Sequence, residues 1–238
     1  MNGHPPDLLV VMPVFNEQAS VESVIREWIA ALQSVSPEFQ LLVIDDGSTD
    51  HTARILNDLR NEFGERLEWK SRPNRGHGQT CVEGYHVAMD RGIPYVLQID
   101  SDGQSDPRHF GEFWERRHQF DVIYGKRMRG DGLQRVIASS ILRIALKWLA
   151  KVDCVDANVP YRLMNTNACA DGIRAVPEDL SLANVGLSVI LKKNPSIRHG
   201  EVPIHFPPRR GGEPSVPISK FATKAIELFA QLKKAGIT

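Results

Sequence analysis

Two aspartates, Asp100 and Asp102, flank Ser101 directly after the short apolar run Tyr95–Ile99. If that run is a strand, side chains two residues apart point to the same side, so both carboxylates reach one point. A carboxylate pair can bind a hard divalent cation that also holds a diphosphate. The ion would then act as a Lewis acid and neutralise charge on a leaving phosphate group. An acidic turn ahead of Pro107 is the competing interpretation.

Polar clusters end two further apolar runs in the same way. Asp45-Asp46-Gly47-Ser48-Thr49-Asp50 follows Leu41–Ile44, and Asn16-Glu17 follows Leu8–Val14. An acidic side chain there can accept hydrogen bonds from a base N–H or a ribose hydroxyl, whereas a capped turn explains Ser48 and Asp50 without a ligand. The sequence contains neither G-x-G-x-x-G nor G-x-x-x-x-G-K-[ST], which disfavours a dinucleotide-binding dehydrogenase and a P-loop enzyme.

Helical patterns separate these apolar runs and set the expected fold. Apolar residues recur at helical spacing over 21–32, 52–63 and 78–91, while the short continuous runs are typical of strands covered on both faces. Strand alternating with helix predicts an open, doubly wound, mainly parallel α/β sheet with helices on both faces. Ligands in such sheets bind at the carboxyl ends of the strands, so we expect all three polar clusters on one rim.

The second half of the chain has fewer regular signals. We expect strands at Val122–Tyr124 and Val202–Phe206 and helices at Ile137–Val152 and Phe221–Lys234, within a single domain over residues 1–238. Lys plus Arg number 29 and Asp plus Glu number 29, which argues against a nucleic acid partner. The three cysteines lack paired spacing and so predict a reducing, cytoplasmic setting. No secretory signal or membrane span is expected.

Four ordered motifs together resemble a known family. They are M-P-V-F-N-E (12–17), V-I-D-D-G-S-T-D (43–50), N-R-G-H-G (74–78) and Q-I-D-S-D-G-Q (98–104). In this order they resemble the family 2 inverting glycosyltransferases of GT-A fold. G-K-R (125–127) and D-A-N-V-P-Y-R-L-M (156–164) narrow the resemblance to the dolichol-phosphate mannose synthase and bactoprenol glucosyltransferase group. The resemblance implies hexose transfer from a UDP- or GDP-sugar to a polyprenyl phosphate.

The resemblance also implies residue roles, with residues of about 8–125 forming the nucleotide-sugar half, 126–216 the acceptor half and 217–238 a C-terminal amphipathic helix. A Mg²⁺ or Mn²⁺ ion and the diphosphate would be held by Asp100, Ser101, Asp102 and Gln104. Base and ribose would contact Pro13, Phe15, Glu17, Asp45 and Asp46, under a loop containing Asn74 and Gly76. Catalytic contacts to phosphate, donor sugar or acceptor would come from Asp102, Arg127, Asp156 and Arg209, with Tyr161, Arg162 and Arg210 nearby.

The acceptor decides whether a base is needed. A phosphate acceptor is largely dianionic near pH 7, because its second pKa is about 6, and it needs no strong base. A soluble hydroxyl acceptor would need one. Asp179, beside Glu178, resembles the base of such enzymes, although Pro177-Glu178-Asp179 is also typical of a helix start. A catalytically inactive scaffold of the same fold is a third hypothesis.

Two basic amphipathic segments favour peripheral contact with the cytoplasmic face of a membrane. Arg143, Lys147 and Lys151 are spaced four residues apart beside an apolar side that includes Trp148. The second segment is Phe221–Lys234. Such helices can rest on an anionic leaflet. The competing interpretation is that both pack on the domain with their lysines in solvent.

Overall fold

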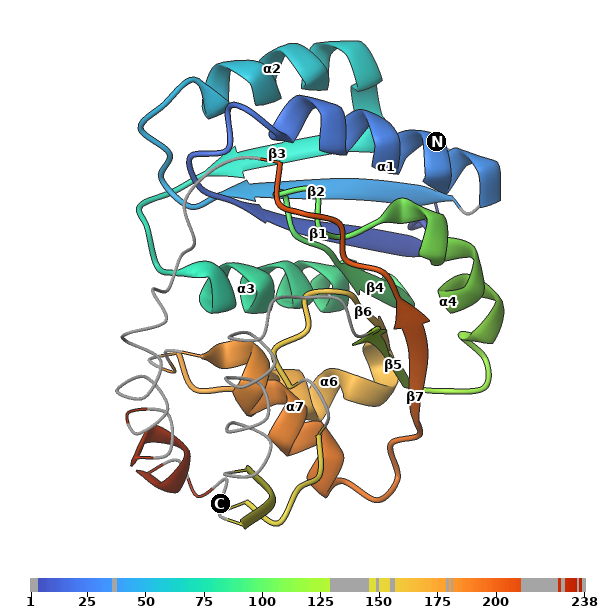
Figure 1. Cartoon of the computed structure of the whole chain (residues 1–238), viewed down its shortest axis with the longest axis vertical. Helices are drawn as coiled ribbons and strands as arrows, with labels where there is room; N and C mark the ends of the chain where they lie inside the picture. The colour runs from blue at the N-terminus through green and yellow to red at the C-terminus, as the bar shows by residue number, and fades with distance from the viewer. Residues whose placement is uncertain are drawn as a thin grey trace.

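A single sheet organises the chain in the computed structural model. It describes residues 4–35, 38–128, 146–148, 150–154, 157–178, 180, 182–210, 227, 230–234 and 236. Seven strands lie in the order β3-β2-β1-β4-β6-β5-β7, with helices on both faces (Figure 1). Paired strands are parallel except where β6 runs antiparallel to β4 and β5. The predicted fold class is confirmed.

Five strands match the predicted runs to within a few residues: β1 Leu8–Val14, β2 Phe39–Asp45, β4 Tyr95–Gln98, β5 Val122–Arg127 and β7 His199–Ile204. Strands β3 (Leu67–Ser71) and β6 (Arg162–Asn165) were not predicted from the sequence. Because β1, β2 and β4 are adjacent and parallel, their carboxyl ends meet at one edge of the sheet. That edge receives the three polar clusters.

The helices form a layer on each face of the sheet. They are α1 (Val21–Val35), α2 (Thr52–Phe63), α3 (His77–Asp90), α4 (Phe110–Arg116), α6 (Thr166–Arg174) and α7 (Ala183–Lys193), with 3₁₀ turns η1 (Gly64–Arg66) and η2 (Pro107–His109). Helices α1, α2 and α4 cover one face, and α3, α6 and α7 cover the other (Figure 1). Every side chain of β1 between these layers is buried, as expected of a strand covered on both faces.

Most of Ile137–Val152 and Phe221–Lys234 lies outside the described residues. The predicted helix start at Pro177 is wrong, because the next described helix, α7, begins at Ala183. In the part of the chain that the structure describes, no helix combines the length and apolar character needed to cross a membrane.

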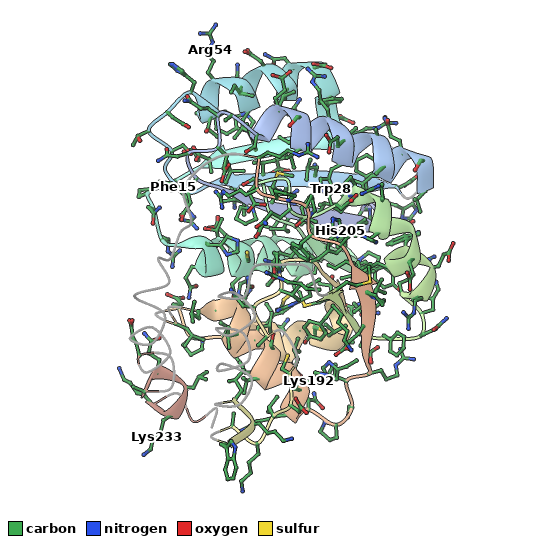
Figure 2. The ribbon with its side chains drawn as sticks, in the orientation of Figure 1. Phe15, Trp28, Arg54, Lys192, His205 and Lys233 are labelled. Atoms are coloured by element: carbon green, nitrogen blue, oxygen red, sulfur yellow. The ribbon has the colours of Figure 1, made fainter. Side chains whose placement is uncertain are left out.

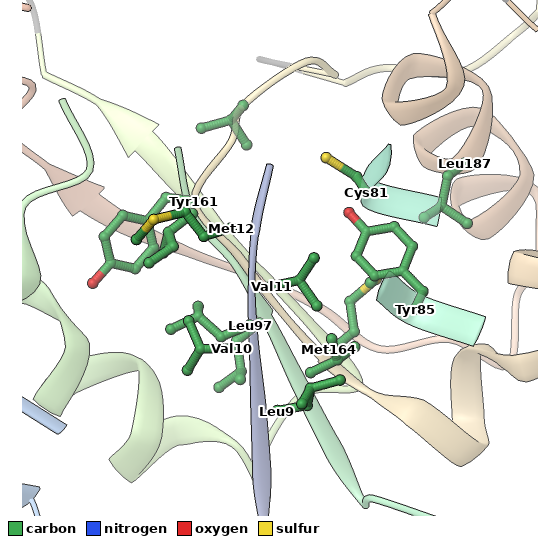
Figure 3. Packing of buried hydrophobic residues seen from close by; sticks show 14 of the residues in the cluster. Leu9, Val10, Val11, Met12, Cys81, Tyr85, Leu97, Tyr161, Met164 and Leu187 are labelled. Carbon is green, nitrogen blue, oxygen red and sulfur yellow. The ribbon is translucent and has the colours of Figure 1, made fainter. Parts of the chain in front are cut away.

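Packing across β1 is close on the face covered by α3. Figure 3 shows Leu9 and Val11 facing Tyr85 of α3, with Val10 and Met12 on the opposite side. A Cβ atom added to Gly84 of α3 would lie 2.3 Å from Cγ1 of Val11. Since real carbon atoms do not approach so closely, α3 can reach the sheet only because residue 84 is a glycine.

We therefore expect Gly84→Ala to lower the free energy of unfolding by about 1–3 kcal/mol, the usual range for overpacking a core. Gly111→Ala in α4 is the matched control, because its added Cβ would meet nothing within 4 Å. Alanine is also the better helix former, so this control should be neutral or slightly stabilising. Urea denaturation measures both. Equal stability of the two variants would contradict the close contact.

Candidate active site

The pair Asp100 and Asp102 lies in a tight loop directly after β4. The backbone N–H of Asp100 donates to Oγ of Ser105 (3.1 Å), and that of Gln104 donates to Oδ1 of Asp102 (2.9 Å). Gly103 between them has φ of +80°, which favours glycine. The loop is closed by its own polar groups, and the Asp102 side chain is 8 % exposed while that of Asp100 is 25 % exposed.

Glu17, beyond the end of β1, is bound to this loop through one serine. Oγ of Ser20 lies 2.7 Å from Oε2 of Glu17 and 3.1 Å from the carbonyl oxygen of Ser101. Burial is the largest influence on Glu17 and raises the pKa of its carboxyl above the usual value, although Ser20 and Arg209 act to lower it. Glu17 is thus a buried acid on the wall of the candidate site.

Residues 205–210, which follow β7 and which we call the strap, cross over the loop that contains Asp100 and Asp102. The guanidinium of Arg209 bridges the two buried acids, with Nη2 on Oε1 of Glu17 and Nη1 3.2 Å from Oδ2 of Asp102. The next residue continues the contact, since the N–H of Arg210 donates to the carbonyl oxygen of Asp102 (3.0 Å). The predicted late basic loop therefore does reach the aspartate pair.

Further contacts fix the strap from both sides. The Arg210 guanidinium pairs with both carboxylate oxygens of Glu27 on α1, at 2.6 and 2.9 Å. Nε2 of Gln104 donates to the carbonyl oxygen of Pro207 (3.2 Å), and the Arg127 guanidinium lies 4.4 Å from the ring centre of Phe206. The strap thus links α1, the aspartate loop and the end of β5, and it brings Arg127 and Arg209 to the same region.

The two aspartates at the carboxyl end of β2 form hydrogen bonds that support the rim of the site. Oδ1 of Asp45 accepts from the N–H of Ser48 (3.0 Å), and its Oδ2 accepts from Oγ of Ser71 (2.8 Å). Asp46 accepts from the N–H groups of Arg75 (2.8 Å) and Gly76 (2.9 Å) and pairs with Arg72. These contacts hold the loop that contains Asn74 and Gly76. Ligand contacts from Asp45 and Asp46 stay predictions.

Phe15 projects from the rim next to these loops. Its neighbour Asn16 has φ of +54°, and the two ends of that residue are tied to the β2 loop: its N–H donates to Oγ of Ser48 (2.9 Å) and its Oδ1 accepts from the N–H of Thr49 (2.8 Å). Pro13 is buried within β1. The Phe15 ring is 47 % exposed and stands at the edge of the molecule (Figure 2), where a planar base could stack on it.

The acceptor-half residues divide into three groups. Tyr161 and Arg162 are fully buried, and Arg162 contacts Oγ of Ser188 (2.8 Å) and the carbonyl oxygen of Ala157 (3.1 Å), so both are part of the core. Arg127 and Arg209 lie at the site, as described. Asp156 and Asp179 lie outside the described residues.

The structure adds two residues that the motifs did not single out. His77 Nε2 lies 2.8 Å from Oδ1 of Asp100. Burial acts to lower the pKa of His77, but the neighbouring Cys81 and Asp100 outweigh it and raise the pKa well above the usual value. Arg72 donates to Asp46, Glu83 and Thr80 and so fixes the rim of β2. His77 could have been noticed inside N-R-G-H-G; nothing in the sequence singled out Arg72.

The donor atoms at this site suit a hard divalent cation. Asp100, Asp102 and Gln104 offer only oxygen ligands, which Mg²⁺ and Mn²⁺ prefer. Among the described residues, no group of three or more histidine, cysteine or acidic side chains could hold a metal ion. The two carboxylates would therefore need oxygens from a bound diphosphate to complete the coordination, as is usual for Mg²⁺.

Two curated proteins have sequences similar to this chain. Undecaprenyl-phosphate 4-deoxy-4-formamido-L-arabinose transferase of Edwardsiella ictaluri is 32 % identical over 118 residues, 48 % of this chain and 35 % of the relative. The protein of that name from Salmonella paratyphi A is 31 % identical over 145 residues, 58 % of this chain and 42 % of the relative. The alignments thus take in less than half of the length of these relatives.

Solved structures share the fold. Glucosyl-3-phosphoglycerate synthase of Mycobacterium tuberculosis, in complex with Mn²⁺, UDP and glucosyl-3-phosphoglycerate, superimposes with a TM-score of 0.68 at 17 % identity, covering 98 % of this chain and 81 % of that one. TarS of S. aureus gives 0.57 at 20 % identity, covering 82 % and 58 %. The fold is the GT-A fold expected from the motifs. Residues 9–172 match the family described as Glycosyl transferase family 2, and the chain belongs to that family.

Proposed function

We propose that this protein is an inverting glycosyltransferase that moves a hexose from a UDP- or GDP-sugar to a polyprenyl phosphate. The observation that carries the proposal is the meeting of Asp102, Glu17 and Arg209 at the carboxyl edge of the sheet, where the strap also contacts Arg127 through Phe206. Acids and guanidinium groups gathered in one place suit a metal-bound diphosphate. The curated relatives, which are named as undecaprenyl-phosphate sugar transferases, support the acceptor class.

Asp100, Asp102 and Gln104 would hold Mg²⁺ or Mn²⁺, which supplies charge neutralisation to the diphosphate when bound. The exposed ring of Phe15 would stack on the base, and the loop around Gly76 would close over the nucleotide. Arg127 and Arg209 would bond phosphate oxygens, for which the planar guanidinium fork is suited. Positioning and electrostatic stabilisation then provide most of the rate enhancement.

The transfer exchanges one bond for another at the sugar. An oxygen of the acceptor phosphate attacks the anomeric carbon, and the bond from that carbon to the diphosphate oxygen breaks, so the nucleoside diphosphate leaves with the bonding electrons. Attack from the opposite side inverts the configuration. A dianionic phosphate carries its own nucleophilic charge, so this acceptor requires no protein base and no role for Asp179.

A lipid-linked acceptor places the enzyme at the cytoplasmic face of a membrane, and one exposed side chain supports this location. Trp148 is 80 % exposed on a short helical segment next to Lys147. Tryptophan and lysine together are typical of surfaces that contact the lipid headgroup region. Peripheral contact through this segment would bring the acceptor to the site.

The experiment that tests the donor site is thermal unfolding with UDP, GDP, TDP or CMP, each with Mn²⁺ and with EDTA. A ligand at about 100 times its dissociation constant adds about 2.7 kcal/mol of stability. We expect one nucleoside diphosphate to raise the melting temperature only with Mn²⁺, and transfer of its sugar to undecaprenyl phosphate. If no nucleotide stabilises the protein, the scaffold hypothesis replaces this proposal.

A further inference from the structure

His77 lies at the candidate metal site although it belongs to a different element from the aspartate pair. It is the first residue of α3, and its Nε2 lies 2.8 Å from Oδ1 of Asp100, which follows β4. The side chain of His77 is 39 % exposed and that of Asp100 is 25 % exposed. The contact therefore lies at the mouth of the site, where a ligand can reach Asp100.

The backbone of His77 is fixed on both sides. Before it, the N–H of Gly76 donates to Oδ2 of Asp46 (2.9 Å). After it, Gly78 lies so close to α7 that an added Cβ atom would be 3.0 Å from the backbone nitrogen of Ala183. The start of α3 is thus held between the rim of β2 and the start of α7, so the histidine has little freedom to move away from Asp100.

The imidazole ring is also supported from within the fold. Its Nδ1 lies 3.9 Å from Sγ of Cys81, one helical turn later. That sulfur accepts from Nδ2 of Asn184 (3.8 Å), whose Oδ1 lies 3.3 Å from the hydroxyl oxygen of Tyr85; this hydroxyl donates its proton to Oε1 of Gln98. Cys81, Asn184 and Tyr85 are buried. Buried, closely packed residues therefore hold the ring in its position beside Asp100.

We propose that His77 is a positioning residue for the divalent cation: by bonding Oδ1 of Asp100 it fixes the orientation of a carboxylate that would hold the metal. This role rests on the proposed function, since it requires that Asp100 contact the ion. Groups that orient metal-ligating carboxylates commonly contribute 10–100-fold to metal affinity. His77 is not among the residues to which the sequence motifs assigned metal binding, nucleotide binding or catalysis.

A purely structural role predicts a different outcome. The contact between His77 and Asp100 is partly exposed, with side chains at 39 % and 25 %. Since exposed ion pairs contribute only about 0–1 kcal/mol to folding, we expect His77→Ala to remain folded in either case. Only the positioning role predicts a selective loss of metal affinity that a side chain with a comparable N–H donor restores. His77→Ala and His77→Gln separate the two, because the amide of glutamine can still donate to Asp100.

The experiment is a titration of the full chain with Mn²⁺, monitored by the electron paramagnetic resonance signal of the free ion, in the presence of UDP and, in parallel, of GDP. We expect His77→Ala to weaken Mn²⁺ binding about tenfold or more and His77→Gln to restore most of the affinity. His86→Ala, a second histidine on α3, is the matched control and should bind as the wild type does. In an Asp100→Ala background, His77→Ala should have no further effect.

The outcomes distinguish this inference from the proposed function. If the wild type does not bind Mn²⁺ in the presence of UDP or of GDP, the proposed function fails, and this inference fails with it. If the wild type binds Mn²⁺ and His77→Ala binds it equally well, the function stands and the positioning role is refuted. The positioning role is also refuted if His77→Ala remains additive with Asp100→Ala, because His77 would then act elsewhere.

Discussion

Asp102→Asn is expected to lower the rate of sugar transfer by about 100- to 1,000-fold, the usual loss when one electrostatic contact to a transition state is removed. Asp102 carries one of the two carboxylates of the candidate metal site and also bonds Arg209 through Oδ2. Asparagine keeps the shape of the side chain and removes its negative charge. The metal ion and Arg209 of the strap would then both lose their charged partner at this position. Initial rates with undecaprenyl phosphate and the donor identified by thermal unfolding measure the effect.

The matched control is Asp106→Asn, four residues later in the same segment. Asp106 accepts from the N–H of Arg108 (2.9 Å) at the start of η2, and an asparagine oxygen can accept the same bond. This variant should keep its Mn²⁺-dependent nucleotide binding and most of its activity. Equal activity of Asp102→Asn and the wild type would exclude Asp102 from the metal site.

The fold could be predicted from the sequence where burial on both faces leaves a simple pattern. Strands β1, β2 and β4 are continuous apolar runs, and their helices α1, α2 and α3 show helical spacing. Strand β6 escaped prediction because its four residues begin with Arg162, a cation that is fully buried. Strand β3 lies at the edge of the sheet and has one buried residue, Leu67, so its sequence lacks the continuous apolar run that predicts a strand.

The candidate site could be predicted only as far as each residue belongs to a motif at a strand end. Asp100, Asp102 and Glu17 were found because the carboxyl ends of parallel strands must meet. Contacts between distant segments have no such local signal: His77 and Asp100 are 23 residues apart, and Arg209 and Glu17 are 192 apart. For Asp46 the motif suggested a ligand contact, which stays a prediction; the structure shows that this carboxylate also accepts hydrogen bonds from the loop after β3, at the N–H groups of Arg75 and Gly76.

Arg209→Met should destabilise the fold by about 1–3 kcal/mol at pH 7. The guanidinium bridges Glu17 and Asp102, whose side chains are 5 % and 8 % exposed, and its removal leaves two nearby acids without this counter-charge. Loss of one partner from a fully buried pair costs about 3–5 kcal/mol, and we expect less because Arg209 itself is 22 % exposed. Arg210→Met is the matched control: its partner Glu27 is 43 % exposed, so at most about 1 kcal/mol is lost.

Because Glu17 is one of the two acids that lose their counter-charge, the loss of stability should depend on pH. Burial already raises the pKa of Glu17 above 4.5, and Arg209 acts to lower it, so Arg209→Met should raise that pKa further. A carboxyl with a raised pKa in the folded state binds more protons than in the unfolded chain, so its contribution to stability is present at low pH and lost as pH rises through the folded pKa. The deficit of Arg209→Met, measured by urea unfolding, should therefore shrink as the pH falls from 7 toward 4.5.

The double variant Glu17→Gln/Arg209→Met tests the same interaction without a change in pH. Glutamine can still accept from Oγ of Ser20 and carries no charge, so most of the cost of the unpaired acid disappears. We expect the double variant to be more stable at pH 7 than Arg209→Met alone, with a coupling energy of about 1–3 kcal/mol. If the two substitutions are additive, Arg209 does not stabilise Glu17. The strap would then be held chiefly by three other contacts: Arg210 with Glu27, Pro207 with Gln104, and Phe206 with Arg127.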